Sequence, residues 1–306
     1  MTAIATHAGV GKLLLNEPMA RYTSWRAGGA ADKFYIPAGL QDLRQFLQSL
    51  AVEEAIYFIG LGSNLLVRDG GIRGTVVLMH NVLTDLRMDG GLVYAEAGVT
   101  CAKLSKFCAK QARQGGEFFA GIPGTVGGAL AMNAGCYGSE TWNVVQRVTT
   151  IDRRGELHSR EASEFVASYR HVEMPSADEW FVAAWLALEA GDAHESAKKI
   201  KALLAQRLNS QPLNMPSAGS TFRNPPSDYA ARLIEACGLK GYIMGGAQVS
   251  EKHANFIVNI GGASALDIEL LIKHIRDTVL EKQGVALQQE VKVMGELQAR
   301  GWELNA

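Results

Sequence analysis

Several features that would assign a class at once are missing from this chain. Its 306 residues carry 30 Lys and Arg against 31 Asp and Glu, so no basic footprint for nucleic acid is visible. Its apolar runs are far shorter than a membrane span. The N-terminus has no basic segment followed by a long apolar core, so no signal peptide is expected. These absences predict a cytoplasmic protein without nucleic-acid or membrane partners.

Cysteine is scarce, and its spacing argues against the common metal sites. The four residues Cys101, Cys108, Cys136 and Cys237 form neither a CxxC pair nor a pattern of metal ligands. Free thiols in a reducing compartment are the default for such a chain. We therefore expect no bound metal. The remaining composition, 47% hydrophobic and 20% charged, is that of a globular protein long enough for two domains.

Both common phosphate-binding fingerprints are incomplete. Gly60-Leu-Gly62 starts like a Rossmann fingerprint, but Leu65 stands where the third glycine belongs. Asn64 is a turn former, so a helix directly after Gly62 is not expected. A second glycine-rich stretch, residues 120–138, lacks the Gly-Lys-Ser/Thr of a Walker A loop.

Glycine itself is abundant, and it gathers in two loops. The first glycine loop is residues 58–70, and the second glycine loop is residues 120–138. Each follows an apolar run. Because glycine has no Cβ, backbone N–H groups in such loops can approach a ligand closely, and successive amides bent into a concavity bind anions. Two such loops favour an extended phosphate ligand such as a dinucleotide. The alternative is that both loops are structural turns between strands.

Hydrophobic periodicity predicts a mixture of helices and strands. Helices are expected at 41–51, 197–208 and from the capping residues Thr100, Ser227 and Ser264, and strands at 55–59, 75–79, 92–97, 180–189, 256–259 and 291–294, with a hairpin over 148–159. The composition of Asn209–Pro212 is typical of a linker and predicts a boundary near residue 210, followed by a smaller α+β domain.

An ordered set of short motifs runs through the chain. It consists of Thr23-Ser-Trp-Arg-Ala-Gly-Gly-Ala30, Gly60-Leu-Gly-Ser-Asn-Leu-Leu66, Gly121-Ile-Pro-Gly-Thr-Val-Gly-Gly128, Met132-Asn-Ala-Gly135, Tyr169-Arg170, Gln211-Pro212, Ala218-Gly-Ser-Thr-Phe-Arg-Asn-Pro225, Gly245-Gly-Ala-Gln-Val-Ser250 and Gln289-Glu-Val291. Its order and spacing resemble the UDP-N-acetylenolpyruvoylglucosamine reductases, also called UDP-N-acetylmuramate dehydrogenases, over residues 22–295. The short stretch between Arg170 and Gln211 resembles their compact form, which lacks an inserted loop with a tyrosine.

The resemblance implies an α+β fold of the vanillyl-alcohol-oxidase type. A PCMH-type FAD-binding domain of two α+β subdomains is expected, together with a smaller α+β substrate-binding domain. The implied ranges are 1–208 for the FAD-binding region, with a subdomain boundary near 65 and a core of about 27–191, and 209–306 for the substrate-binding domain.

The resemblance also implies the chemistry. The enzyme would hold FAD non-covalently and use NADPH to reduce UDP-N-acetylglucosamine enolpyruvate to UDP-N-acetylmuramate. This reaction belongs to peptidoglycan synthesis, and so to cell-wall biogenesis, cell shape and cell division. A cytoplasmic monomer is expected.

Site residues carry over position by position. Arg170 matches the arginine that binds the enolpyruvyl carboxylate, Ser220 the proton donor to the α-carbon, and Glu290 the acidic residue near the C-terminus. The implied cofactor residues are Arg26, Gly28, Gly60, Gly62, Ser63, Asn64, Gly121, Pro123, Gly124, Thr125, Gly127, Gly128, Asn133 and Ala134. Substrate-binding candidates are Tyr169, Arg207, Arg223, Asn224 and Lys240.

Two other functions are compatible with the same pattern. One is a sugar or alcohol oxidase of the same fold with a covalent flavin, for which Cys136 is the attachment point closest in sequence. The other is a non-catalytic nucleotide-binding module. The chain departs from the family's frequent Tyr-Arg-x-Ser at one position, where it has Val172 in place of the serine.

Overall fold

The computed structural model describes residues 10–298, which fall into two compact units. Unit 1 comprises the residues up to Leu14, Phe34–Leu61 and Thr75–Arg207. Unit 2 comprises Leu15–Lys33, Gly62–Gly74 and the residues from Leu208 onward. Unit 2 is therefore assembled from three separate stretches of the chain.

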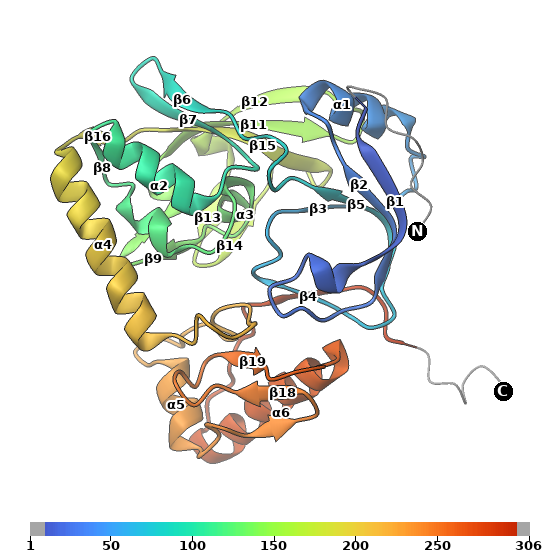
Figure 1. Ribbon diagram of the computed structural model, residues 1–306, viewed down its shortest axis with the longest axis vertical. Coiled ribbons are helices and arrows are strands. Elements are labelled where there is room, and N and C mark those ends of the chain that lie inside the picture. Colours follow the sequence, from blue (N-terminus) through green and yellow to red (C-terminus); the bar gives the residue numbers. More distant parts are fainter. Residues whose placement is uncertain (1–9, 299–306) are drawn as a thin grey trace. The chain divides into compact units, whose positions relative to one another are not determined.

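The main sheet of unit 1 has five strands in the order β12-β11-β15-β7-β6. Their bounds are β6 Leu86–Asp89, β7 Leu92–Glu96, β11 Val145–Asp152, β12 Leu157–Glu161 and β15 Glu179–Leu186. Every neighbouring pair is antiparallel. Helices α2 (Cys101–Lys110) and α3 (Val126–Ala131) lie beside this sheet (Figure 1) and share a buried apolar cluster with it.

A second apolar cluster of unit 1 joins the same sheet to α1 (Leu40–Ser49). Leu43 and Leu47 of α1 are buried against Ile151 of β11. β3 (Ile56–Ile59) and β5 (Ile72–Leu78) pair in parallel and contribute to this cluster. They belong to a four-stranded sheet in the order β1-β2-β5-β3, in which β1 is Lys12–Pro18 and β2 is Ala30–Ile36.

Shorter elements complete unit 1. They are the pairs β8 (Arg113–Gln114) with β16 (Glu189–Ala190), β9 (Gly135–Cys136) with β10 (Ser139–Glu140), and β13 (Val166–Ser168) with β14 (His171–Glu173), the 3-10 turns η2 (Glu117–Gly121), η3 (Thr141–Asn143) and η4 (Ala162–Glu164), and the helix α4 (Ala193–Ser210), whose last residues belong to unit 2.

Unit 2 packs two helices on a small antiparallel sheet. The sheet has the order β17-β18-β19, and helices α5 and α6 lie beside it (Figure 1). The bounds are α5 Ala230–Ala236, β17 Ile243–Met244, β18 Ala247–Val249, β19 Ile257–Asn259 and α6 Ala265–Gln283, with the turn η1 at Met19–Arg21. A parallel pair joins β4 (Leu65–Val67) to β20 (Lys292–Met294). Trp25 and Leu66 are fully buried in the core of this unit.

Most of the predicted elements are confirmed, and the caps explain why. Thr100 accepts a hydrogen bond from the Lys103 amide and starts α2. Ser264 and Asp267 form a capping box at the start of α6. The seven-residue strands β1 and β2 were not predicted. Between residues 10 and 298, no helix is long and apolar enough to cross a membrane.

One predicted cap is wrong. Ser227 was expected to start the helix that contains Leu233, but α5 begins at Ala230. The side-chain oxygen of Asn224 accepts the hydrogen bond from the Ala230 amide at 3.1 Å. Ser227 instead has a left-handed backbone, with φ of 63°, in the turn before the helix.

The predicted domain division, 1–208 and 209–306, stays a prediction. The compact units differ from it because two early stretches, Leu15–Lys33 and Gly62–Gly74, belong to unit 2. Both ends of the predicted ranges, 1–9 and 299–306, lie outside the described residues.

Candidate functional site

In unit 1 the two glycine loops meet. A Cβ placed on Gly60 would lie 2.4 Å from the Thr125 hydroxyl oxygen, so only glycine allows this approach. The loops are about sixty residues apart in sequence. β3 leads into the first of them, and α3 starts within the second. The contact supports the expectation that both loops serve one ligand.

The start of α3 uses several of its own amides. Thr125 caps the helix by accepting from the Gly128 amide at 3.3 Å. The amides of Val126 and Gly127 donate to the carbonyls of Val99 and Ala97 at 2.8 and 2.9 Å. A phosphate bound by this loop would therefore rely mainly on amides that precede α3, at Gly124 and Thr125, because Pro123 lies there too but has no N–H.

The glycines of α3 differ in their surroundings. A Cβ on Gly127 would lie 3.0 Å from the Cβ of Ala97, which leaves little room. A Cβ on Gly128 would meet, among the described residues, only the Thr125 hydroxyl at 3.7 Å. Packing therefore explains a glycine at 127, whereas at 128 the protein leaves space that a bound group can use.

The other end of the second loop lies beside two arginines. A Cβ on Gly121 would come within 2.6 Å of the Cys136 sulfur. That thiol donates to the Phe118 carbonyl at 3.0 Å. Burial raises the pKa of Cys136 to about 11, although the positive charges of Arg207 and Arg170 act to lower it. The two guanidinium groups thus act on one point of unit 1.

Arg207 is partly desolvated in this neighbourhood. Burial lowers its pKa, while Tyr137 and Cys136 act in the opposite direction. Arginine stays charged in proteins, so this position presents a cation that has lost part of its hydration. Tyr137 donates from its hydroxyl to the Leu203 carbonyl of α4 at 2.9 Å, which ties the loop to the helix that carries Arg207.

Asn133 acts as a clamp inside unit 1. Its side-chain nitrogen donates to a Glu140 carboxylate oxygen at 2.8 Å and to the Ser168 carbonyl at 3.1 Å. Its side-chain oxygen accepts from the Trp142 amide at 3.1 Å. The side chain is 3% exposed and its hydrogen-bonding groups are in use, so its contribution is to hold the backbone from Asn133 onward. The next residue, Ala134, is held by hydrogen bonds from Thr141 to its carbonyl.

Arg170 occupies a strained turn. It is the second residue of the two-residue turn between β13 and β14, and its φ is +57°. A non-glycine side chain in this left-handed region costs on the order of 1–3 kcal/mol, and such strain gathers at functional sites. Its guanidinium donates to the Gly135 carbonyl at 2.9 Å and lies 5.4 Å from the centre of the Tyr169 ring. The hydrogen bond from Arg170 to Gly135 and the one from Asn133 to Ser168 therefore connect the same two backbone stretches.

Val172, the departure from the family pattern, is a core residue. It is 9% exposed, belongs to the apolar cluster under the main sheet and pairs with Ala167 across the β13–β14 hairpin. The position supports Arg170 through packing and hairpin register, where a serine would act through its hydroxyl.

In unit 2 the early residues dock onto the C-terminal stretch. Trp25 donates from its indole nitrogen to the Ile257 carbonyl at 2.7 Å. Arg26, which follows it, is exposed and has φ of +56°. Gly62 packs on the neighbouring residues, since a Cβ there would lie 1.9 Å from the Tyr22 carbonyl oxygen. Gly28 likewise packs on β4.

Ser220 and Glu290 are brought together in unit 2. The Glu290 amide donates to the Thr221 carbonyl at 2.8 Å, and Phe222 pairs with Gln289 in an antiparallel bridge. Ser220 directly precedes this paired stretch and follows Gly219, whose φ is +75°. The backbone therefore holds Glu290 opposite Thr221, the residue that follows Ser220, in two paired stretches that lie outside the named strands.

The first glycine loop joins the stretch that contains Glu290. Asn64 donates from its side chain to the Glu290 carbonyl at 3.3 Å, and its own carbonyl accepts from the Lys292 amide at 3.0 Å. Ser63, the residue before it, is partly buried in the loop. The cofactor candidate Asn64 thus bonds to the stretch of the catalytic candidate Glu290, which pairs with the residues that follow Ser220.

The three substrate-binding candidates of unit 2 have different surroundings. The Arg223 amide donates to the Gln288 carbonyl at 2.8 Å, so its backbone extends the same pairing. Asn224 has its side-chain oxygen in use as the cap of α5. Lys240 pairs with Glu235 at 3.2 Å on the surface.

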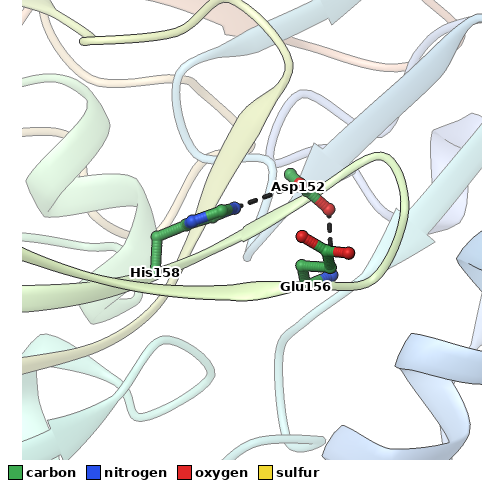
Figure 2. Close-up of side chains that lie close together, drawn as sticks. All are labelled: Asp152, Glu156 and His158. Carbon is green, nitrogen blue, oxygen red and sulfur yellow. Dashed lines mark hydrogen bonds and ion pairs between the residues drawn. The ribbon is translucent and has the colours of Figure 1, made fainter.

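A group of possible metal ligands lies at the turn between β11 and β12. Asp152, Glu156 and His158 come close together there (Figure 2). One Asp152 oxygen accepts from the amides of Arg154 and Glu156, and the other lies 3.0 Å from His158 Nε2. Burial raises the pKa of Asp152, but these hydrogen bonds outweigh it, so the pKa is lowered. The cluster is accounted for by closure of the hairpin.

One residue that contacts the paired stretch after Ser220 was not predicted from the sequence. Asn255 contacts the backbone of both Thr221 and Phe222 and is 3% exposed. The available signal was an amide side chain inside the apolar run from Ala254 to Val258. Buried polar side chains are usually hydrogen-bonded, so an amide in such a run is expected to bond to a neighbouring segment.

Comparison with known proteins gives two matching families. Residues 31–160 match the family described as FAD binding domain. Residues 211–294 match the family described as UDP-N-acetylenolpyruvoylglucosamine reductase, C-terminal domain.

Whole-chain relatives agree with these matches. UDP-N-acetylenolpyruvoylglucosamine reductases from Alkalilimnicola ehrlichii and Thiobacillus denitrificans are 58% and 54% identical to the chain. Each alignment covers 94% of this chain, and 97% and 94% of the respective relative. The crystal structure of the reductase from Thermus caldophilus superposes with a TM-score of 0.80 at 30% identity, covering 93% of this chain and 99% of that one.

These likenesses confirm the predicted fold class, an α+β fold with a vanillyl-alcohol-oxidase-type FAD-binding domain. The contact of the two glycine loops and the space at Gly128 fit that cofactor. The chain is therefore an FAD-containing oxidoreductase, and it belongs to the family of UDP-N-acetylenolpyruvoylglucosamine reductases.

Proposed function

We propose that the chain catalyses the NADPH-dependent reduction of UDP-N-acetylglucosamine enolpyruvate to UDP-N-acetylmuramate. The relatives that match over 94% of the chain carry the name of this reductase. The observation that carries the proposal is the pairing of Glu290 with the stretch that follows Ser220, because the reaction needs an acid and a polar partner held in register. Its place is peptidoglycan precursor synthesis, and we propose a cytoplasmic monomer.

FAD, when bound, carries a hydride from NADPH to the β-carbon of the enolpyruvyl group. The residues proposed to hold it are those of the two glycine loops, which approach each other at Gly60 and Thr125. Backbone amides suit its pyrophosphate because they present partial positive charge without adding side chains. Val126, Gly127 and Gly128 already donate within the protein, as does Ile122 to the Phe119 carbonyl, and Pro123 has no N–H. We therefore assign the phosphate contacts of the second loop to the amides of Gly124 and Thr125.

Arg170 is proposed to bind the carboxylate of the substrate. As the β-carbon gains hydride, negative charge develops on the α-carbon and its carboxylate. A guanidinium binds a carboxylate with two parallel hydrogen bonds, and donors aimed in advance at developing charge are commonly the largest catalytic contribution. The strained turn supports this role, because it holds the arginine in place before substrate binds.

Ser220 is proposed to donate the proton to the α-carbon. A serine hydroxyl is a weak acid, so its position relative to a strongly basic carbon must be well defined. The paired backbone after Ser220 provides that definition. Glu290 is proposed to orient the carboxylate of the substrate or to share a proton with it. Tyr169, Arg207, Arg223, Asn224 and Lys240 stay candidates for binding the sugar nucleotide.

The oxidase alternative predicts a covalent flavin at Cys136. That thiol is partly buried, donates to a carbonyl and has a pKa raised to about 11, which keeps it protonated and poorly nucleophilic. We therefore expect denaturation to release the flavin.

The decisive experiment measures NADPH oxidation by the purified protein. Oxidation that requires UDP-N-acetylglucosamine enolpyruvate and yields UDP-N-acetylmuramate is the expected result. Mass spectrometry of the cofactor released on denaturation should show FAD. NADPH oxidation that is independent of the sugar nucleotide, or a flavin that stays attached to the chain, would exclude the proposed function.

A further inference from the structure

Asn255 occupies a rigid position at the start of β19. The Phe256 amide donates to the His253 carbonyl at 3.0 Å, and the Ser250 amide donates to the Phe256 carbonyl at 2.8 Å. These hydrogen bonds close a tight turn before the strand. Asn255 is 3% exposed, so its side chain faces the interior of unit 2 and has no access to bulk water.

The side chain of Asn255 pairs with the backbone of Phe222. Its oxygen accepts from the Phe222 amide at 2.9 Å, and its nitrogen donates to the Phe222 carbonyl at 2.8 Å. The backbone carbonyl of Asn255 also accepts from the Thr221 amide at 2.8 Å. One residue thereby makes three hydrogen bonds to two consecutive residues, as a strand partner does.

The same two residues hold Glu290 from the other side. Thr221 accepts from the Glu290 amide at 2.8 Å, and Phe222 pairs with Gln289. The stretch that follows Ser220 thus lies between Asn255 and the extended segment of Gln289 and Glu290. Thr221 and Phe222 are each 1% exposed, so water cannot replace a missing partner there.

We propose that Asn255 is a positioning residue that sets the register between the Ser220 hydroxyl and the Glu290 carboxyl. The inference rests on the proposed function, because it assigns a structural cause to the protonation step of that reaction. Asn255 acts through the backbone of Thr221 and Phe222, which follows Ser220 and accepts the hydrogen bond of the Glu290 amide.

The chemistry of the amide makes the proposal testable by an isosteric change. In Asn255→Asp, a protonated carboxyl still accepts from the Phe222 amide and donates to the Phe222 carbonyl. An ionised carboxylate loses the donor and places a charge beside that carbonyl. Burial and this carbonyl both disfavour the ionised form, so the new carboxyl should have a raised pKa.

The experiment measures the two half-reactions of Asn255→Asp as a function of pH by stopped-flow absorbance of the flavin. Reduction by NADPH should match wild type at all pH values. Reoxidation by the enolpyruvyl substrate should fall about 10- to 100-fold at high pH, because small misplacements of reacting groups have effects of this size. It should approach the wild-type rate as the pH is lowered. Wild type, measured in parallel, shows whether the proposed function itself holds.

Ile275→Val is the matched control. Ile275 is fully buried in α6 of the same unit, and its shortening lowers the melting temperature modestly without changing the residues of the paired stretch. It should leave the ratio of reoxidation to reduction unchanged. If Asn255→Asp resembled this control, or slowed both half-reactions equally at every pH, the positioning role would be excluded.

A second readout does not depend on turnover. Hydrogen exchange of the Glu290 amide reports the bond to the Thr221 carbonyl. In Asn255→Asp its protection factor should drop at high pH and recover at low pH. If Asn255→Asp does not fold, Asn255→Ser, which keeps one hydrogen-bonding group, is read in the same two ways. Unchanged protection at Glu290 would overturn the proposal even if wild type lacked the expected activity.

Discussion

Arg170 in unit 1 and Ser220 in unit 2 are positioned by different means. Arg170 lies in a two-residue turn with a left-handed backbone, and its guanidinium is tied to the Gly135 carbonyl. Ser220 precedes a stretch whose backbone is hydrogen-bonded on one side to Asn255, mostly to its side chain, and on the other side to the backbone of Glu290 and Gln288. Local strain, opposed by the clamp of Asn133, places the first group, whereas backbone register places the second.

The difference has a physical reason in the side chains involved. Arginine is long and charged, so a small turn can aim it and its head can reach away from the backbone. The serine hydroxyl is one bond beyond Cβ, so its position follows the backbone almost directly. A residue with a short side chain therefore needs an exact backbone, and unit 2 supplies one by hydrogen bonding Thr221 and Phe222 on both edges.

The largest expected effect comes from Ser220→Ala, which removes the group that backbone register is proposed to place. The variant should bind FAD and be reduced by NADPH at a near-normal rate. Reoxidation by the enolpyruvyl substrate should slow by about 100- to 10,000-fold, the usual range for loss of a general acid. Stopped-flow absorbance separates the two steps. Equal slowing of both would make Ser220 a structural or cofactor residue.

Arg170→Lys tests the group that the strained turn is proposed to place. Lysine keeps the charge but loses the planar fork that matches a carboxylate. Turnover should fall by about 100- to 1000-fold, as for other losses of a preorganised donor. Steady-state NADPH oxidation measures this effect. Near-normal turnover would remove Arg170 from the site.

Arg170→Gly sharpens the same comparison, because it separates strain from function. Relief of the left-handed strain should roughly offset the lost hydrogen bond to Gly135, each on the order of 1 kcal/mol. The melting temperature should therefore stay close to that of wild type while turnover is lost. A large drop in melting temperature would show that the turn depends on the arginine side chain.

The two glycines of α3 give a smaller effect confined to unit 1. Gly128→Ala should fold normally, since a Cβ there meets little, but FAD occupancy should fall if a bound group uses that space. Gly127→Ala should instead lower the melting temperature, because its Cβ would press on Ala97. The absorbance ratio of flavin to protein and thermal unfolding are the measurements. Full FAD occupancy in Gly128→Ala would contradict the proposed cradle.

The smallest expected effect is on how the stability of unit 1 depends on pH. Burial raises the pKa of Glu179, but bonds from Arg160 and Thr150 outweigh it, so the pKa is lowered. A lowered carboxyl pKa stabilises the fold above the unfolded value, about 4.3, and this contribution is lost as the pH falls through the folded value. Glu179→Gln should therefore weaken the loss of stability below about pH 4.5. Denaturant unfolding at pH 3 to 7 tests this, and an unchanged pH profile would contradict it.

Local signals predicted the elements that local chemistry controls. The cap at Thr100 and the capping box at Ser264 predict the starts of their helices, because in each the hydroxyl and the amide that donates to it lie three residues apart. The failure at Ser227 has the same origin. The cap of α5 comes from Asn224, six residues before the amide it binds, which lies beyond the spacing that a sequence motif describes.

The candidate site was named by family resemblance, and its means of support was not predictable. Nothing in the sequence around Ser220 points to Asn255, 35 positions later, or to Glu290 beyond it. The left-handed backbone at Arg170 could not be predicted from the sequence either, because arginine does not favour that conformation. Long-range pairing and backbone strain are properties of the folded chain.

The assembly of unit 2 from three stretches has a consequence for biosynthesis. Trp25 and Leu66 leave the ribosome early in translation, but their core partners in α5 and α6 are made last. The 133 residues of Thr75–Arg207 must be synthesised in between, which takes on the order of ten seconds at about 5–20 residues per second. During that interval both side chains lack their final neighbours. Nascent chains halted before α5 should therefore bind a chaperone that recognises exposed apolar segments, and release from the ribosome should end that binding.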